Sequence, residues 1–194
     1  MKRLLLFCAA CLFWGCMERE ELVPSGSQLL RNTDLSNSLD NVSPWNSVMA
    51  TPFNVGVSDE VFFSGNRSLF LEGTTEEATG SVAWVQHYTG PMPFANRRLR
   101  LRVMMKGENI ELNGINSNVW VTVRAWPAEG ASGTFGRSVS SQRTNFISGT
   151  FDWTPFELTL PNFPNDSNRI SVFLVMGPRT TGKIYFDEIT LTVE

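Results

Sequence analysis

The stretch that decides the fold reads Gly182-Lys183-Ile184-Tyr185-Phe186-Asp187-Glu188-Ile189-Thr190-Leu191. Two shorter apolar runs, at residues 156–160 and 170–176, come before it. Short apolar runs rich in β-branched and aromatic residues, with Gly and Pro in the breaks between them, are typical of strands. We expect these three strands to close a β-sandwich, with the last of them completing the fold.

The same period of two runs through the chain from Gln28 onward. Further strands are predicted at residues 68–71, 82–88, 99–105 and 119–125, separated by clusters of Gly, Pro, Asn and Ser. No window longer than eight residues has the 3.6-residue period of a helix. We therefore predict an all-β protein with one sandwich domain over residues 28–194.

The N-terminus has the pattern of an export signal. Two basic residues precede the apolar residues 4–14, which are too few to span a bilayer, and Gly15 precedes Cys16. A small residue before Cys resembles the lipobox of bacterial lipoproteins, although aromatic residues stand where that pattern has Leu and a small residue. The resemblance implies a signal peptide at residues 1–15, lipidation at Cys16 and a flexible acidic tether at residues 16–27. An ordinary secretory signal, cleaved elsewhere, is the alternative.

Lipidation implies a protein of the bacterial cell envelope whose only membrane contact is its lipid anchor. We expect it at the outer membrane or the cell surface rather than at the inner membrane. The only cysteines are Cys8, Cys11 and Cys16, so the mature chain forms no internal disulfide. The chain carries 16 basic and 19 acidic residues, and losing a basic signal makes it more acidic still. This charge argues against nucleic acid as a partner.

Several motifs together resemble one family of binding domains. They are Asn32-Thr33-Asp34-Leu35 followed by Trp45, the turn Gly65-Asn66-Arg67-Ser68-Leu69, Trp153 ahead of a strand, and the ending Ile184-Tyr185-Phe186-Asp187-Glu188-Ile189. They look like bacterial carbohydrate-binding modules of the galactose-binding-like jelly-roll type, and the likeness covers most of residues 28–194. It implies a single jelly-roll β-sandwich with a polysaccharide or other glycan as partner, and it does not name the sugar.

The first glycan-binding candidates lie on one predicted strand. Within residues 119–126, Trp120, Arg124 and Trp126 share one face, opposite a row of Val and Ala. Aromatic rings stack on the apolar faces of sugars, and Arg offers planar hydrogen-bond donors to their polar groups. If the small apolar row faces the core, the Trp and Arg row lies on the other side of the sheet, where exposed tryptophans need a covering or a use.

Four more candidates lie on two other strands. Arg100 and Arg102 alternate with apolar residues. If they shared a sheet with the tryptophans, the result would be a cationic, aromatic surface suited to an anionic or polyhydroxylated glycan. The resemblance adds Trp84 and Gln86, on the strand where related modules place cleft residues. The alternative is that the basic residues only solvate an outer face while the tryptophans pack under loops.

Residues for catalysis are few. His87 is the only histidine, and it lies in the middle of a predicted strand. Asp187 and Glu188 are adjacent in another strand, so their carboxylates are expected on opposite faces rather than across a cleft. We therefore predict that the protein is not an enzyme.

A structural Ca²⁺ is the one metal that the resemblance suggests. Related modules hold it partly through an Asp of the last strand, which corresponds to Asp187, and through residues of the N-terminal motif. Ser36 stands where the family has an acidic residue, and Asp34 is the available substitute. Ca²⁺ needs several oxygen ligands. No cofactor is required for binding.

The sequence thus favours a non-catalytic glycan-binding surface lipoprotein. The alternative is a structural or protein-interaction lipoprotein that uses the same sandwich. A glycan-degrading hydrolase or lyase is the third reading, and it would need a cleft with an acid or base pair.

Overall fold

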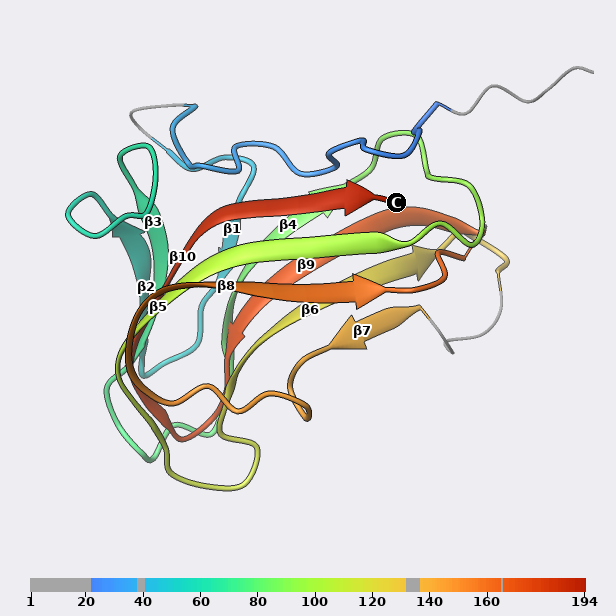
Figure 1. Cartoon of the computed structure of the whole chain (residues 1–194). Helices are drawn as coiled ribbons and strands as arrows, with labels where there is room; N and C mark the ends of the chain where they lie inside the picture. Colours follow the sequence, from blue (N-terminus) through green and yellow to red (C-terminus); the bar gives the residue numbers. More distant parts are fainter. Residues whose placement is uncertain (1–21, 38–40, 132–136, 165) are drawn as a thin grey trace, which may run out of the picture.

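Two antiparallel five-stranded sheets pack face to face (Figure 1). The computed structural model describes residues 22–37, 41–131, 137–164 and 166–194. Sheet A has the strand order β2-β3-β10-β5-β8, and sheet B has the order β1-β4-β9-β6-β7. The strands are β1 (Asn46–Val48), β2 (Phe53–Ser58), β3 (Ser68–Gly73), β4 (Val82–Tyr88), β5 (Leu99–Leu112), β6 (Val119–Pro127), β7 (Ser138–Ser140), β8 (Gly149–Leu160), β9 (Ser167–Met176) and β10 (Thr180–Val193).

The all-β prediction is confirmed, and each strand expected from the sequence is present. The short strands β1, β2 and β7 were not predicted. β1 and β7 have three residues each, too few to show a period of two. β2 does alternate Phe53, Val55 and Val57 with Asn, Gly and Ser, so its sequence pattern was overlooked. Within the described residues there is no helix at all, and so none with the length and apolar character needed to cross a bilayer.

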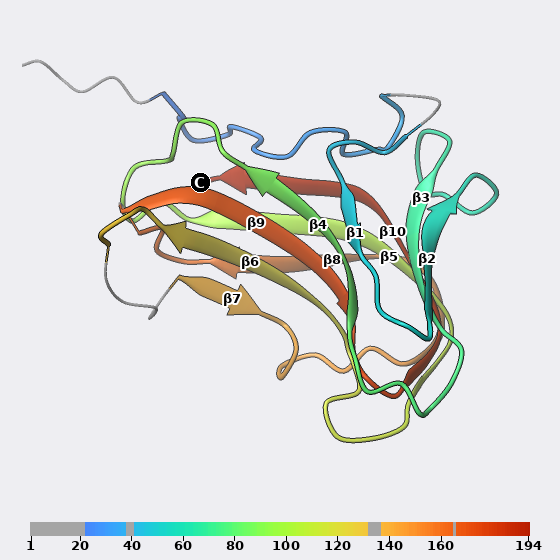
Figure 2. The same ribbon diagram turned by 180° about the vertical axis from the view of Figure 1, so that it is seen from behind.

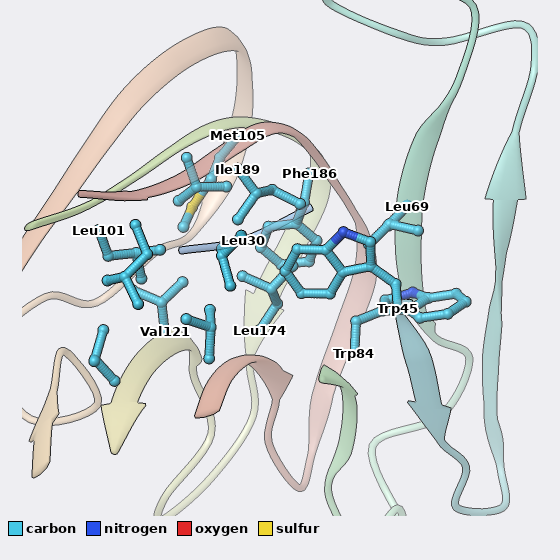
Figure 3. Close-up of a cluster of buried hydrophobic side chains, with 14 of the residues drawn as sticks. Leu30, Trp45, Leu69, Trp84, Leu101, Met105, Val121, Leu174, Phe186 and Ile189 are labelled. Atoms are coloured by element: carbon cyan, nitrogen blue, oxygen red, sulfur yellow. The ribbon is translucent and has the colours of Figure 1, made fainter. Parts of the chain in front are cut away.

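The core lies between the inner faces of the two sheets. Val121 of β6 and Leu174 of β9 come from sheet B, Leu101 of β5 and Phe186 of β10 come from sheet A, and none of the four has exposed surface. Figure 3 shows them in one cluster together with Trp84. Burying a side chain of this size stabilises a fold by about 1.5–3 kcal/mol. Because these inward rows are buried, only the outer face of each sheet is left for function.

The segment before β1 closes the side of the sandwich between β10 and β4. β3 pairs with β10 only as far as Phe186. Beyond that point residues 26–33 take over the edge, because Leu29 N–H donates to Leu191 O at 2.9 Å and Ile189 N–H donates to Thr33 O at 2.9 Å. In Figures 1 and 2 this segment, in blue, runs along the top of both views above β10 and β4.

Contact with the sandwich begins before Gln28, the first residue of the expected domain. Val23 is 4% exposed, and Gly26 N–H donates to Val193 O at 2.8 Å. Residues 23–27 were expected within the tether, but they pack against the folded domain. The expected signal peptide and Cys16 lie outside the described residues.

Candidate functional site

The outer face of sheet B carries a ladder of polar and aromatic side chains on its three central strands. Since β6 buries its Val and Ala row, Trp120, Thr122, Arg124 and Trp126 point outward. β9 pairs with β6 on one side and with β4 on the other. The register sets Trp126 opposite Arg169, Arg124 and His87 on either side of Ser171, Thr122 opposite Phe173, and Trp120 opposite Val175.

Trp126 is the centre of this face. The guanidinium carbon of Arg124 lies 3.8 Å from the indole centroid, and that of Arg169 lies 4.6 Å from it. The indole Nε1–H donates to Ser171 Oγ at 2.8 Å, which fixes the ring on the sheet. A hollow of about 370 Å³ opens beside it, lined by Thr89, Trp126, Pro127, Asn168 and Arg169. The site therefore combines an aromatic ring, two cations and polar groups around an open space.

Ser171 links this ring to the histidine. Its Oγ lies 2.7 Å from His87 Nδ1. The hydroxyl can donate to Nδ1 while its oxygen accepts the indole N–H, and in that arrangement the imidazole is neutral with its proton on Nε2. Burial, together with the nearby charge of Arg169, lowers the pKa of His87.

A Ser and a His in hydrogen-bond contact are also the elements of a nucleophile and base pair. Ser171, however, has no exposed surface, and its oxygen is engaged by Trp126. A substrate carbonyl has no path to this oxygen. The geometry makes Ser171 a positioning residue for the indole.

The two guanidinium groups beside Trp126 have no carboxylate partner among the described residues. Some other cations do: Arg100 pairs with Glu194, Lys106 with Asp152 and Arg137 with Asp166. In addition, Arg169 Nε is a buried donor with no hydrogen-bond partner in the described structure. The Trp126 end of the face is thus locally cationic on a chain of formal net charge −3.

Trp120 lies at the other end of the same row. It lies six positions before Trp126 along β6, which corresponds to a distance of about 20 Å. The Trp120 ring rests on Gly177, where an added Cβ would lie only 2.6 Å from Trp120 Cζ3. The ring is half-buried there. Trp120 and Trp126 therefore bound an extended face rather than a single pocket.

Arg100 and Arg102 lie on the other side of the molecule from the tryptophans. They are in β5, which belongs to sheet A, and they point away from the core. The strand of these arginines, β5, therefore does not share a sheet with β6, the strand of the tryptophans. A surface that combines these arginines with Trp120 and Trp126 therefore does not exist.

Trp84 and Gln86 point into the sandwich. Trp84 is 6% exposed, and its indole N–H donates to Phe70 O of sheet A. Gln86 is 2% exposed and binds both peptide groups of Arg31, accepting from its N–H at 2.7 Å and donating to its C=O at 3.0 Å. The assignment of these two residues to a ligand-facing cleft was wrong, because β4 turns this row inward to hold the two sheets and the N-terminal segment together.

The pair expected to hold Ca²⁺ does not form a site. Asp187 is fully buried, and its carboxylate accepts the N–H groups of Phe63 at 2.7 Å, Ser64 at 2.9 Å and Glu188 at 2.7 Å. Burial outweighs these bonds and raises the pKa of Asp187. Asp34 binds Ser36, and no group of three acidic, His or Cys side chains suited to a metal occurs in the described ranges. These residues do not fit a calcium site.

Sequence reasoning missed Arg169 and Ser171. The sequence does carry a signal for them, because Arg169, Ser171, Phe173 and Val175 alternate with the buried apolar residues of β9. A strand was predicted at residues 170–176, but no outward-facing row on it. Because β9 lies between β6 and β4 in sheet B, its outward row belongs to the same face as Trp126 and His87.

Comparison with known proteins gives a fold and no family. No family model and no curated protein matches the sequence. Among solved structures, the enzymatically active domain of tailspike protein 4 from bacteriophage CBA120 superposes with a TM-score of 0.63 at 15% identity, over 86% of this chain and 21% of that one. The chain thus spans about a fifth of the tailspike.

Two smaller structures match along almost their whole length. TmCBM61, solved in complex with β-1,4-galactotriose, has a TM-score of 0.56 at 18% identity, over 87% of this chain and 99% of that one. The chain has the jelly-roll β-sandwich fold of such carbohydrate-binding modules. The Stig cyclase Fisc from Fischerella sp. TAU shares the fold, with a TM-score of 0.59 at 15% identity, over 88% of this chain and 98% of that one. Identities this low establish the fold alone.

Proposed function

We propose that this protein binds a glycan on the outer face of sheet B. The observation that carries the proposal is the Trp126 site, where a fixed indole, two guanidinium groups and an open hollow meet. Two guanidinium groups already lie over the indole, so a sugar ring would stack on the part of the indole that lines the hollow, while Arg, Asn and Thr side chains offer partners for its hydroxyl groups. The fold that it shares with a galactotriose-binding module is consistent with this role.

Retention on immobilised polysaccharides tests the proposal. Trp126→Ala is expected to abolish retention of the purified protein, since it removes the stacking surface and the contact with both guanidinium groups. Trp153→Ala is the matched control, because Trp153 is another half-buried tryptophan that packs on Phe63 of the sheet A side, with ring centroids 5.9 Å apart. Equal losses in the two variants would count against the Trp126 site, and a wild-type protein retained on no polysaccharide would end the proposal.

We infer further that the protein binds its glycan without cleaving it. The buried position of Ser171 and the full engagement of Asp187 by backbone donors support this inference. Incubating the protein with each retained polysaccharide should release no new reducing ends. Release of fragments that disappears in a site variant would replace binding by catalysis as the function.

The proposed setting is the bacterial cell envelope, with a lipid on Cys16. The support is the sequence pattern of an export signal before this cysteine. Labelled fatty acid should be incorporated into the wild-type chain in cells and should not be incorporated into Cys16→Ser. Fractionation of the same cells should recover the labelled protein at the outer membrane or the cell surface.

A protein partner is the second candidate. It is favoured by an apolar hollow of about 230 Å³ between β8 and the loop before it, lined in part by Met105, Phe146, Phe151 and Phe156. Phe146 is 69% exposed. Capture of an envelope protein that is lost in Phe146→Ser and kept in Trp126→Ala would favour this function over glycan binding.

A further inference from the structure

We infer that the sugar recognised beside Trp126 is an acidic one, whose carboxylate is held by Arg124 and Arg169. This inference rests on the proposed glycan-binding function and specifies its ligand as a polysaccharide that contains uronic acid residues. Three features of the site point to an anion rather than to a neutral sugar alone.

The first feature is uncompensated charge. Arg124 and Arg169 both lie against one indole, and neither has a carboxylate partner in the part of the chain that the structure describes. Two guanidinium groups beside one ring carry like charges and repel each other. An anion between them removes this repulsion. A neutral sugar leaves it in place.

The second feature is an unused donor. Arg169 is half-buried, and its Nε is shielded from solvent without a hydrogen-bond partner among the described residues. A buried donor without an acceptor destabilises the free protein. Arg169 also lines the hollow of about 370 Å³, so a ligand in this space lies beside its side chain. A carboxylate matches the planar donor arrangement of Arg with two oxygens.

The third feature is preorganisation. Ser171 fixes the indole through the 2.8 Å bond to Nε1, and both guanidinium groups lie against that fixed ring. Little side-chain freedom is left to lose when a ligand binds. Thr89 and Asn168 line the same hollow and are suited to the hydroxyl groups of the sugar ring.

The test compares soluble polygalacturonate, neutral galactan and a sulfated galactan in titrations with the wild-type protein. We expect polygalacturonate to bind at least about ten times more tightly than galactan, as charge-assisted hydrogen bonds allow. Arg124→Gln and Arg169→Gln should each lower its affinity by about tenfold or more and should lower the affinity for galactan by a smaller factor, because a neutral sugar loses a hydrogen bond to Arg but no charge-assisted pair. Arg124 is exposed, so its replacement should not disturb folding. Arg169→Lys adds a second test, since it keeps the charge and removes the planar fork.

Arg102→Gln is the matched control, because it removes the same charge from the exposed outer face of sheet A. An unchanged affinity in this variant, with losses in the other two, supports the inference. Equal binding of galactan and polygalacturonate that depends on Trp126 overturns the inference and leaves glycan binding intact. Preference for the sulfated polymer overturns the carboxylate assignment. Binding of none of the three, together with no retention on other glycans, removes both the inference and the proposed function.

Discussion

His87 shows how one residue couples the candidate site to pH. It is the only histidine of the chain, so its titration can be followed without interference from another imidazole. Burial and Arg169 lower its pKa in the folded state. The unfolded chain therefore takes up this proton more readily than the folded protein. The contribution of His87 to stability is fully present above about pH 6.5, the value of an unperturbed histidine, and is lost as the pH falls toward the folded pKa.

The prediction is a difference between two melting curves. Between pH 7.5 and pH 5.5 the melting temperature of the wild-type protein should fall more than that of His87→Gln, which keeps a side chain able to accept from Ser171 and does not titrate. Thermal unfolding at several pH values measures both. Parallel curves for the two proteins would mean that His87 has the same pKa in the folded and unfolded states.

Asp187 is another single residue on which the structure depends. It holds Phe63 and Ser64 against sheet A, and Phe63 packs on Trp153. Asp187→Ala leaves three backbone N–H groups without their acceptor, so it should lower the free energy of unfolding by about 3 kcal/mol or more. Asp152→Ala is the control, since its carboxylate is exposed and solvent screens its ion pair with Lys106, so this variant should lose much less. Urea denaturation compares them, and similar losses in both variants would show that Asp187 does not anchor the loop.

At the scale of strands, alternation alone could predict the inward face of β6 but not that of β4. In β6 a small apolar row alternates with Trp and Arg, so only one face can be buried. In β4 both rows are apolar apart from Gln86 and His87, and the residue types do not distinguish the two faces. Sheet membership was also out of reach, because β5 and β6 are neighbours in sequence and yet lie in different sheets. Arg102 and Trp126 lie in different sheets because the chain crosses from one sheet to the other between β5 and β6. No local sequence pattern predicts this crossing.

A substitution at Gln86 tests whether its contact with the N-terminal segment stabilises the sandwich. Its side chain replaces a strand partner for Arg31 by binding both the N–H and the C=O of that residue. Gln86→Ala removes both hydrogen bonds of a side chain that is 2% exposed, so the free energy of unfolding should fall by about 1–3 kcal/mol. Gln142→Ala is the control, since the side chain of Gln142 makes no hydrogen bond among the described residues. Faster hydrogen exchange at Leu29 and Leu191 in Gln86→Ala would localise the effect, and unchanged exchange would contradict it.

For the whole molecule, the early contact of the N-terminal segment limits how far the sandwich can stand from a membrane. Val23 is already buried against the domain, although the tether had been expected to extend to residue 27. If Cys16 carries the proposed lipid, only the chain from Cys16 to Val23 separates bilayer and domain, and its fully extended length is about 25 Å. The sandwich itself should therefore lie close to the lipid headgroups.

Neutron reflectometry on supported bilayers that carry the lipidated protein measures this distance. The water-rich gap between headgroups and protein should not exceed about 25 Å, because the chain between Cys16 and Val23 reaches no further. Inserting twelve Gly and Ser residues after Leu22 should widen the gap, since the average end-to-end distance of a flexible chain grows from about 15 Å to about 24 Å when it lengthens from about 7 to about 19 residues. A wild-type gap well above the limit would show that residues 23–27 detach from the sandwich at the membrane, and Gly26 N–H would then no longer be bound to Val193. The spacer variant also separates anchoring from recognition, because its affinity for soluble polysaccharide should match that of the wild-type protein.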